Sequence, residues 1–159
     1  MRRLLIVSLI ALAGCSWLSD LLVPDIPRAV FEAQDRANGV AFGLLGQLHQ
    51  WVNDPGTIPP GSASDVHLQI DEILVDLRFV RDWMLEAKVD EKVSQTVIDL
   101  LVAWQDYVDK EFCTDNAWLD NPVPMTSETQ SAWAQVFTKI TNLHHQLHVW
   151  MEEKGIKDD

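Results

Sequence analysis

Cysteine is scarce in this chain, which has only two, Cys15 and Cys113, among its 159 residues. No CxxC pair or cysteine cluster is present, so the sequence lacks the usual spacing of a zinc site or a redox-active dithiol. Cys113 is expected to be a small buried apolar residue. An intermolecular disulfide or a reactive thiol at Cys113 is the alternative.

Basic residues are also few. Lysine and arginine together number 12 against 24 aspartate and glutamate residues, which gives a formal net charge of −12. A surface of this sign repels nucleic acid and anionic lipid headgroups. The chain has no Ser-His-Asp order, glycine-rich phosphate loop or metalloprotease helix, so its motifs do not predict an enzyme.

A hydrophobic run long enough to cross a bilayer is missing too. The apolar stretch from Leu4 to Leu12 is far shorter than the roughly 20 residues that a membrane-spanning helix needs. Arg2 and Arg3 precede this stretch, and the small residues Ala13 and Gly14 follow it. A positive end, a short apolar core and small residues before a cleavage site are typical of a secretory signal peptide.

The sequence Leu12-Ala13-Gly14-Cys15 resembles the lipobox of bacterial lipoproteins. The resemblance covers only the leader. It implies cleavage before Cys15, diacylglycerol on the Cys15 sulfur and an acyl chain on the new N-terminus. Because Ser16 rather than aspartate follows, the resemblance implies the periplasmic side of the outer membrane rather than the inner membrane. An ordinary secretory signal with a chance cysteine is the alternative.

Cleavage at this position divides the chain into a signal peptide (1–14), a lipidated tether (15–26), a body (27–155) and a polar tail (156–159) that is expected to fray. Loss of the two leader arginines leaves 10 basic residues against 24 acidic ones, a net charge of −14. Membrane attachment is therefore expected to come from the lipid, since each buried methylene contributes about 0.8 kcal/mol.

Helical periodicity dominates the body. Apolar residues recur at intervals of three and four over 27–52, 65–87, 91–112 and 127–151. Ser64 or Asp65 is expected to cap the second helix, and Ser127 with Gln130 to form a capping box on the fourth. Residues 113–126 read as a long loop, and no strand-like alternation is present. The sequence predicts an all-α, antiparallel four-helix bundle after a short N-terminal tether.

Three residues near the C-terminus form a candidate metal site. On a helical wheel centred on Ile140, His144 lies about 40° away, His148 about 80° and His145 about 140°. His144 is thus expected at the edge of the core and His145 in water. His144 and His148 could share a metal with Met151, although a core-edge imidazole without a ligand is the simpler interpretation.

Two other features suggest contact with a partner. Trp118 lies in the long loop, where a partly exposed tryptophan is typical of interface hot spots. Gly39, Gly43 and Gly46 fall at about 160°, 200° and 140° from Ala41, opposite the apolar stripe of the first helix. Small residues at this spacing permit close approach of another helix, whereas neutral drift on a solvent-facing surface would give the same pattern.

These patterns favour a non-enzymatic, lipid-anchored helical bundle that binds another protein of the cell envelope. The main alternative is a bundle that binds a metal or small ligand. Phage-encoded lipoproteins that block receptors or take part in lysis are similar in build and provide a further analogy. Hydrolysis of cell-wall sugars through paired acids is the least favoured hypothesis, because no acidic pair is distinguished from the others.

Overall fold

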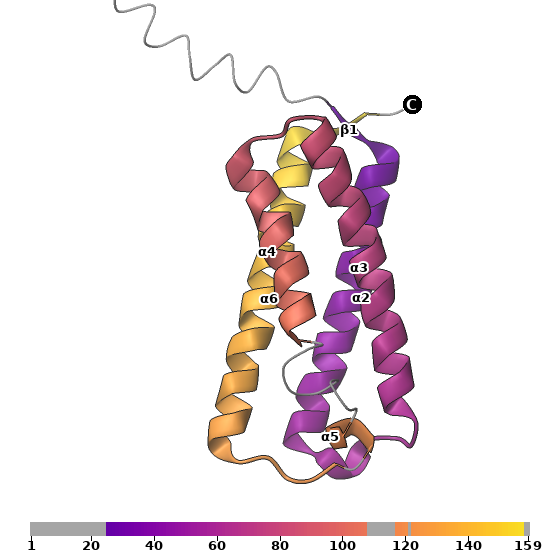
Figure 1. Cartoon of the computed structure of the whole chain (residues 1–159), viewed down its shortest axis with the longest axis vertical. Helices are drawn as coiled ribbons and strands as arrows, with labels where there is room; N and C mark the ends of the chain where they lie inside the picture. Colours follow the sequence, from indigo (N-terminus) through magenta and orange to yellow (C-terminus); the bar gives the residue numbers. More distant parts are fainter. Residues whose placement is uncertain (1–24, 108–116, 121, 158–159) are drawn as a thin grey trace, which may run out of the picture.

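The computed structural model describes residues 25–107, 117–120 and 122–157. The predicted leader, Cys15 and Cys113 lie outside the described residues. Four long helices form the body, in the order α2 (Arg28–Asn53), α3 (Ser62–Glu86), α4 (Glu91–Tyr107) and α6 (Ser127–Lys154). They run alternately down and up the molecule (Figure 1). The predicted all-α four-helix bundle is confirmed.

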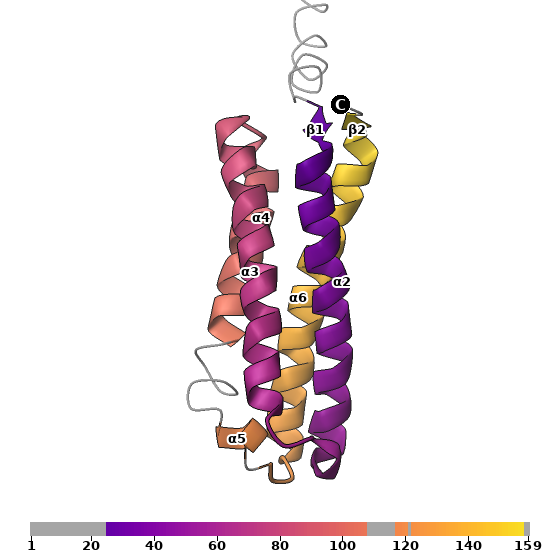
Figure 2. The same cartoon turned by 90° about the vertical axis from the view of Figure 1, so that its right-hand side faces the viewer.

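The helices pack as a closed ring. α2 lies against α3 and α6, and α4 lies against the same two helices (Figure 2). Each helix turns its apolar stripe to the centre, as expected for amphipathic helices that have no other way to bury that face. Side chains with almost no exposure come from all four helices: Leu44, Leu48, Ile70, Ile73, Leu77, Leu100, Trp104, Ile140 and Leu147.

The fourth side of the bundle is shorter than the other three. α4 has 17 residues, a length of about 26 Å, whereas α6 has 28 residues and reaches about 42 Å. A single helical turn, α5 (Ala117–Asp120), contacts α3 near the end of the bundle that α4 does not reach (Figure 1). Its Leu119 is buried. The segment predicted as a long loop therefore contributes to the core.

Two helix starts differ from the prediction. α3 begins at Ser62 behind Gly61, whose φ of +86° is a left-handed conformation that favours glycine. α6 is capped by Thr126, one residue before the predicted cap, and the Thr126 hydroxyl accepts a hydrogen bond from the Thr129 N–H (3.2 Å). The predictions of Ser64 or Asp65 and of Ser127 as caps were wrong because the flanking turns fix where each helix begins.

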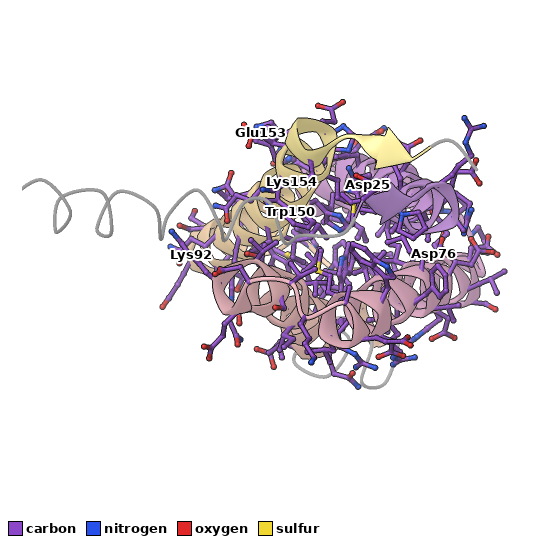
Figure 3. The ribbon with its side chains drawn as sticks, turned by 90° about the horizontal axis from the view of Figure 1, so that it is seen from above. Asp25, Asp76, Lys92, Trp150, Glu153 and Lys154 are labelled. Atoms are coloured by element: carbon purple, nitrogen blue, oxygen red, sulfur yellow. The ribbon has the colours of Figure 1, made fainter. Side chains whose placement is uncertain are left out.

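A small parallel ladder joins the two ends of the body. β1 (Ile26–Pro27) pairs with β2 (Ile156–Lys157), so Ile26 stands opposite Ile156. Ile26 is fully buried, although the sequence placed it in the tether, and the start of the tail is paired rather than frayed. The chain therefore enters and leaves the described body at one end, where Asp25, Glu153 and Lys154 lie (Figure 3).

Candidate functional site

A polar cluster interrupts the core between α2 and α6. Gln34 and Asn38 stand one turn apart on the buried face of α2, and both are enclosed. They meet His148 and His144 of α6, which are also one turn apart. Because a buried polar group is costly unless it is hydrogen-bonded, the partners of each side chain determine what this cluster can do.

His144 is held between two helices. Its Nε2 accepts a hydrogen bond from Nε1–H of Trp104 on α4 (3.0 Å), so the ring proton is assigned to Nδ1. Nδ1–H then donates to Oδ1 of Asn38 (2.7 Å). Burial lowers the pKa of His144 from 6.5 to about 4. His144 is therefore a neutral structural imidazole at physiological pH.

His148 is only half-buried. Its Nδ1 lies 3.2 Å from Oε1 of Gln34, and its Nε2 lies 3.3 Å from Oε1 of Glu152. The Gln34 amide nitrogen is buried and has no hydrogen-bond partner among the described residues. An unpaired buried amide of this kind typically costs about 1–3 kcal/mol. The hydrogen bonds of the Gln34–His148 pair are therefore less complete than those of the Asn38–His144 pair.

The predicted metal ligands do not form an open coordination site. The lone pair on His144 Nε2 is used by Trp104, and a metal there would have to break that buried hydrogen bond. Met151 is fully buried in the core. Nowhere in the described part of the chain do three or more His, Cys, Asp or Glu side chains gather in a way that could hold a metal ion. The exposure of His145 is confirmed, and His144, which was predicted at the edge of the core, is fully buried.

Aromatic rings extend the cluster along the core. Trp104 lies edge-on to Tyr107, and Tyr107 to Trp133, with ring centroids 5.6 and 5.3 Å apart. Phe137 continues the row at 5.2 Å from Trp133. These contacts join α4 to α6, and both Trp104 and Trp133 are buried in the core.

Trp118 and the three glycines of α2, which were predicted to contact a partner, differ in how much of their surface the fold itself uses. Trp118 is half-buried against the core, and its indole N–H donates to the Val123 carbonyl (2.9 Å), so part of this side chain serves the fold. Gly39, Gly43 and Gly46 are exposed, and a Cβ added at any of them would meet no atom within 4 Å. The close approach that these glycines permit is therefore not made by any described part of the chain.

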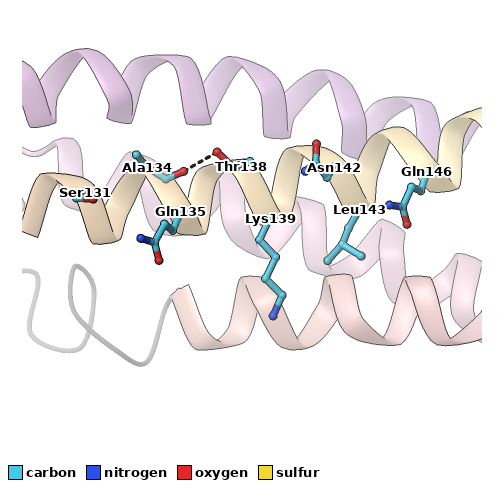
Figure 4. A pocket seen from close by; sticks show the side chains of 8 residues that line it. All are labelled: Ser131, Ala134, Gln135, Thr138, Lys139, Asn142, Leu143 and Gln146. Atoms are coloured by element: carbon cyan, nitrogen blue, oxygen red, sulfur yellow. Dashed lines mark hydrogen bonds between the residues drawn. The ribbon is translucent and has the colours of Figure 1, made fainter.

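The surface has shallow grooves along the helices. One, of about 600 Å³, follows the outside of α6, where Lys139 and Leu143 extend towards α4 (Figure 4). Lys139 is its one ionisable lining residue. A second groove, of about 580 Å³, runs between α2 and α3 and includes Gly39 and Val75. Both are open troughs, a shape that accommodates an extended or helical partner better than a small molecule.

Over the described ranges, no helix combines the length and hydropathy needed to traverse a bilayer. Comparison of the chain with protein families, with curated proteins and with solved structures finds no match. The proposal that follows is therefore based on the residues and geometry of this chain.

Proposed function

We propose that the chain is a lipid-anchored helical bundle that binds another protein of the cell envelope and has no catalytic role. The anchor is Cys15, which would carry diacylglycerol and an acyl chain and would hold the bundle on the periplasmic side of the outer membrane. The leader sequence supports the anchor, and the surface of the bundle supports the binding role.

The observation that carries the binding role is the number of large apolar side chains that the bundle exposes. Among the described residues, eight are more than a third exposed: Phe42, Leu68, Val75, Phe79, Leu85, Val102, Val123 and Val136. Scattered single residues of this type are normal on a protein surface. Here, however, four of them lie on one helix, α3, and three of these four share one face of it. An apolar row of this kind is typical of a face that a partner covers.

The fold would also orient this surface. The described body begins at Asp25, at the end of the bundle that holds β1, β2 and the end of α6 (Figure 3). Asp25 follows Cys15 by ten positions, which limits the distance between the lipid and the body to about 35 Å. The helices are up to about 42 Å long, so a partner could reach their sides without entering the membrane.

The anchor is tested by intact-mass spectrometry of the native protein extracted from membranes. We expect a chain that begins at Cys15 and carries the mass of the lipid, and we expect Cys15→Ser to remain unprocessed. A native chain that retains Met1, or that has no added mass at Cys15, would refute the anchored form.

The binding role is tested by photocrosslinking in intact cells, with a photoreactive residue placed in turn at Val75, Trp118 and Val102. We expect a discrete protein adduct from at least one position that disappears in Cys15→Ser cells, because that variant lacks the lipid that would hold the bundle at the outer membrane. Absence of any adduct at all three positions would refute the binding role.

A further inference from the structure

We infer that the groove between α2 and α3 binds a basic amphipathic helix of a partner protein. The inference rests on the proposed binding function and specifies its surface and the chemistry of its partner. Three observations carry it: an apolar ridge on α3, an open trough beside that ridge, and the charge of the residues that line the trough.

The ridge consists of Leu68, Val75 and Phe79, which are 61%, 61% and 49% exposed. Intervals of seven and four residues place them within about 40° of one another on the helix. They lie about 160–180° from the fully buried Leu77. α3 thus carries apolar side chains on two opposite faces. The inner face is covered by the described bundle, whereas the outer face is open and also holds Glu72 and Glu86.

The trough lies between this ridge and the outer surface of α2. It is lined by Val75 of α3 and by Gly39 and Val40 of α2. The wall at Gly39 carries no side chain, and the space above it is open, because a Cβ there would meet nothing within 4 Å. The backbone of a docked helix could therefore come close to α2 while its apolar side chains pack on the ridge.

The charged lining selects the partner. Arg36 makes a two-pronged ion pair with Asp76 (2.8 and 3.2 Å), which raises the pKa of the arginine and engages the one cation of the trough. Asp71 and Glu72 add two exposed carboxylates. The lining therefore has one positive and three negative side chains, and lysine or arginine on the edges of a docked helix would complement it.

The same charges disfavour two other occupants. A second copy of the chain that docked through this groove would bring its own Asp71 and Glu72 against the same residues, and like charges at an interface are destabilising. An anionic lipid surface would be repelled for the same reason. A cationic helix satisfies both the ridge and the acidic lining.

The test uses the acylated full chain in nanodiscs of zwitterionic lipid, with empty nanodiscs as the blank. The probe is a fluorescent peptide of about 18 residues, or five helical turns, with leucine on one face and lysine on the other. A peptide with glutamate in place of lysine is the charge control. Binding is followed by fluorescence anisotropy at low and high salt, since pairing of exposed charges weakens as salt increases.

Two variants at exposed positions should weaken binding to the groove and leave the fold intact. Val75→Ser removes the centre of the ridge, and Gly39→Gln fills the trough while improving helix propensity. Val102→Ser is the matched control, because Val102 is 50% exposed on α4 and lies outside the groove. Glu72→Gln tests the charge, with Glu153→Gln on α6 as its control.

We expect the lysine peptide to bind the wild type, Val102→Ser and Glu153→Gln equally. Val75→Ser and Gly39→Gln should weaken binding about tenfold or more, Glu72→Gln should weaken it at low salt, and the glutamate peptide should not bind. Equal binding to all variants, or no binding to the wild type, would overturn the inference. Two other results would also overturn the inference: a dimer of the chain in sedimentation that Val75→Ser abolishes, and adsorption of the chain to anionic vesicles that Val75→Ser abolishes. Either result would identify a different occupant of the groove.

The failure of this inference differs from the failure of the proposed function. Adducts in cells at Trp118 or Val102 but not at Val75, with no peptide binding, would refute the groove and leave the binding role in place. A lack of lipid on Cys15 and of any adduct would refute the proposed function, whatever the peptide does.

Discussion

Replacement of His144 with glutamine should remove a specific part of the acid sensitivity of the bundle. In the folded chain the pKa of His144 is lowered to about 4, whereas an exposed histidine has a pKa of 6.5. Above pH 6.5 both states are neutral at this residue, and folding carries no penalty from it. Between pH 6.5 and 4 the unfolded chain takes up the proton first, so the free energy of unfolding falls as the pH falls.

The magnitude follows from the two pKa values. At about 1.4 kcal/mol per pH unit, the free energy of unfolding should be about 3 kcal/mol lower at pH 4 than at pH 7, because the buried imidazole stays neutral while that of the unfolded chain is protonated. Its neighbours cannot offset the charge, because Trp104 on α4 and Asn38 and Phe42 on α2 are all uncharged. Protonation of Nε2 would also place two N–H groups against each other at the Trp104 contact.

Urea unfolding at a series of pH values, followed by far-UV circular dichroism, measures this loss. Glutamine can accept from Trp104 and donate to Asn38, so His144→Gln keeps both hydrogen bonds and removes the titration. We expect it to lose about 3 kcal/mol less than the wild type between pH 7 and pH 4. His145→Gln, at the exposed neighbouring position, should behave like the wild type. Equal pH slopes for the wild type and His144→Gln would refute the assigned role of His144.

Three further predictions concern stability and metals. Trp104→Phe should lower the free energy of unfolding by about 2–4 kcal/mol in urea, because it leaves a gap and deprives His144 of its donor. Gly43→Ala and Gly46→Ala should each raise it by up to about 1 kcal/mol, since the new methyl groups meet no atom; a loss of stability would contradict the open face. Addition of zinc or copper, or of a chelator, should leave the thermal midpoint unchanged, and a metal-dependent rise that His148→Gln abolishes would restore the metal hypothesis.

The four helices could be predicted because each buries one continuous apolar stripe. On α3 the buried residues Val66, Ile70, Ile73, Leu77 and Val80 alternate at intervals of four and three, and no other secondary structure gathers such a set on one face. Helix ends were less predictable, because a cap depends on the turn that precedes it. Gly61 and Thr126 are the N-caps because of the backbone conformation of the loops before α3 and α6. The spacing of apolar residues carries no information about those loops.

The pairing of β1 with β2 could not be predicted for a different reason. It joins residues 26–27 to residues 156–157, and two-residue strands show no alternation. Only the closure of the bundle brings these segments together, since the up-and-down path returns α6 to the end where α2 begins (Figure 1). Burial of Ile26 follows from that closure and has no local signal.

The partners of His144 and His148 on α2 were not predicted, although the sequence carries a signal for them. Gln34 and Asn38 lie only about 20° and 60° from Ala41 on the wheel of α2, which places both amides on its apolar face. Polar residues there predict a polar partner across the core. A histidine can bind a metal, but the hydrogen bonds of His144 with Asn38 on α2 and with Trp104 on α4 indicate that this residue serves the fold.

The glycines of α2 connect the stability of the bundle to its proposed function. Glycine in a helix interior costs about 1 kcal/mol relative to alanine, so Gly39, Gly43 and Gly46 together cost about 3 kcal/mol. That is a large part of the 5–15 kcal/mol that typically stabilises a domain. Within the described body nothing contacts the space above them, so no internal contact offsets this cost. A helix docked beside Gly39 would offset part of it, because the absence of a side chain is then what allows the two backbones to approach.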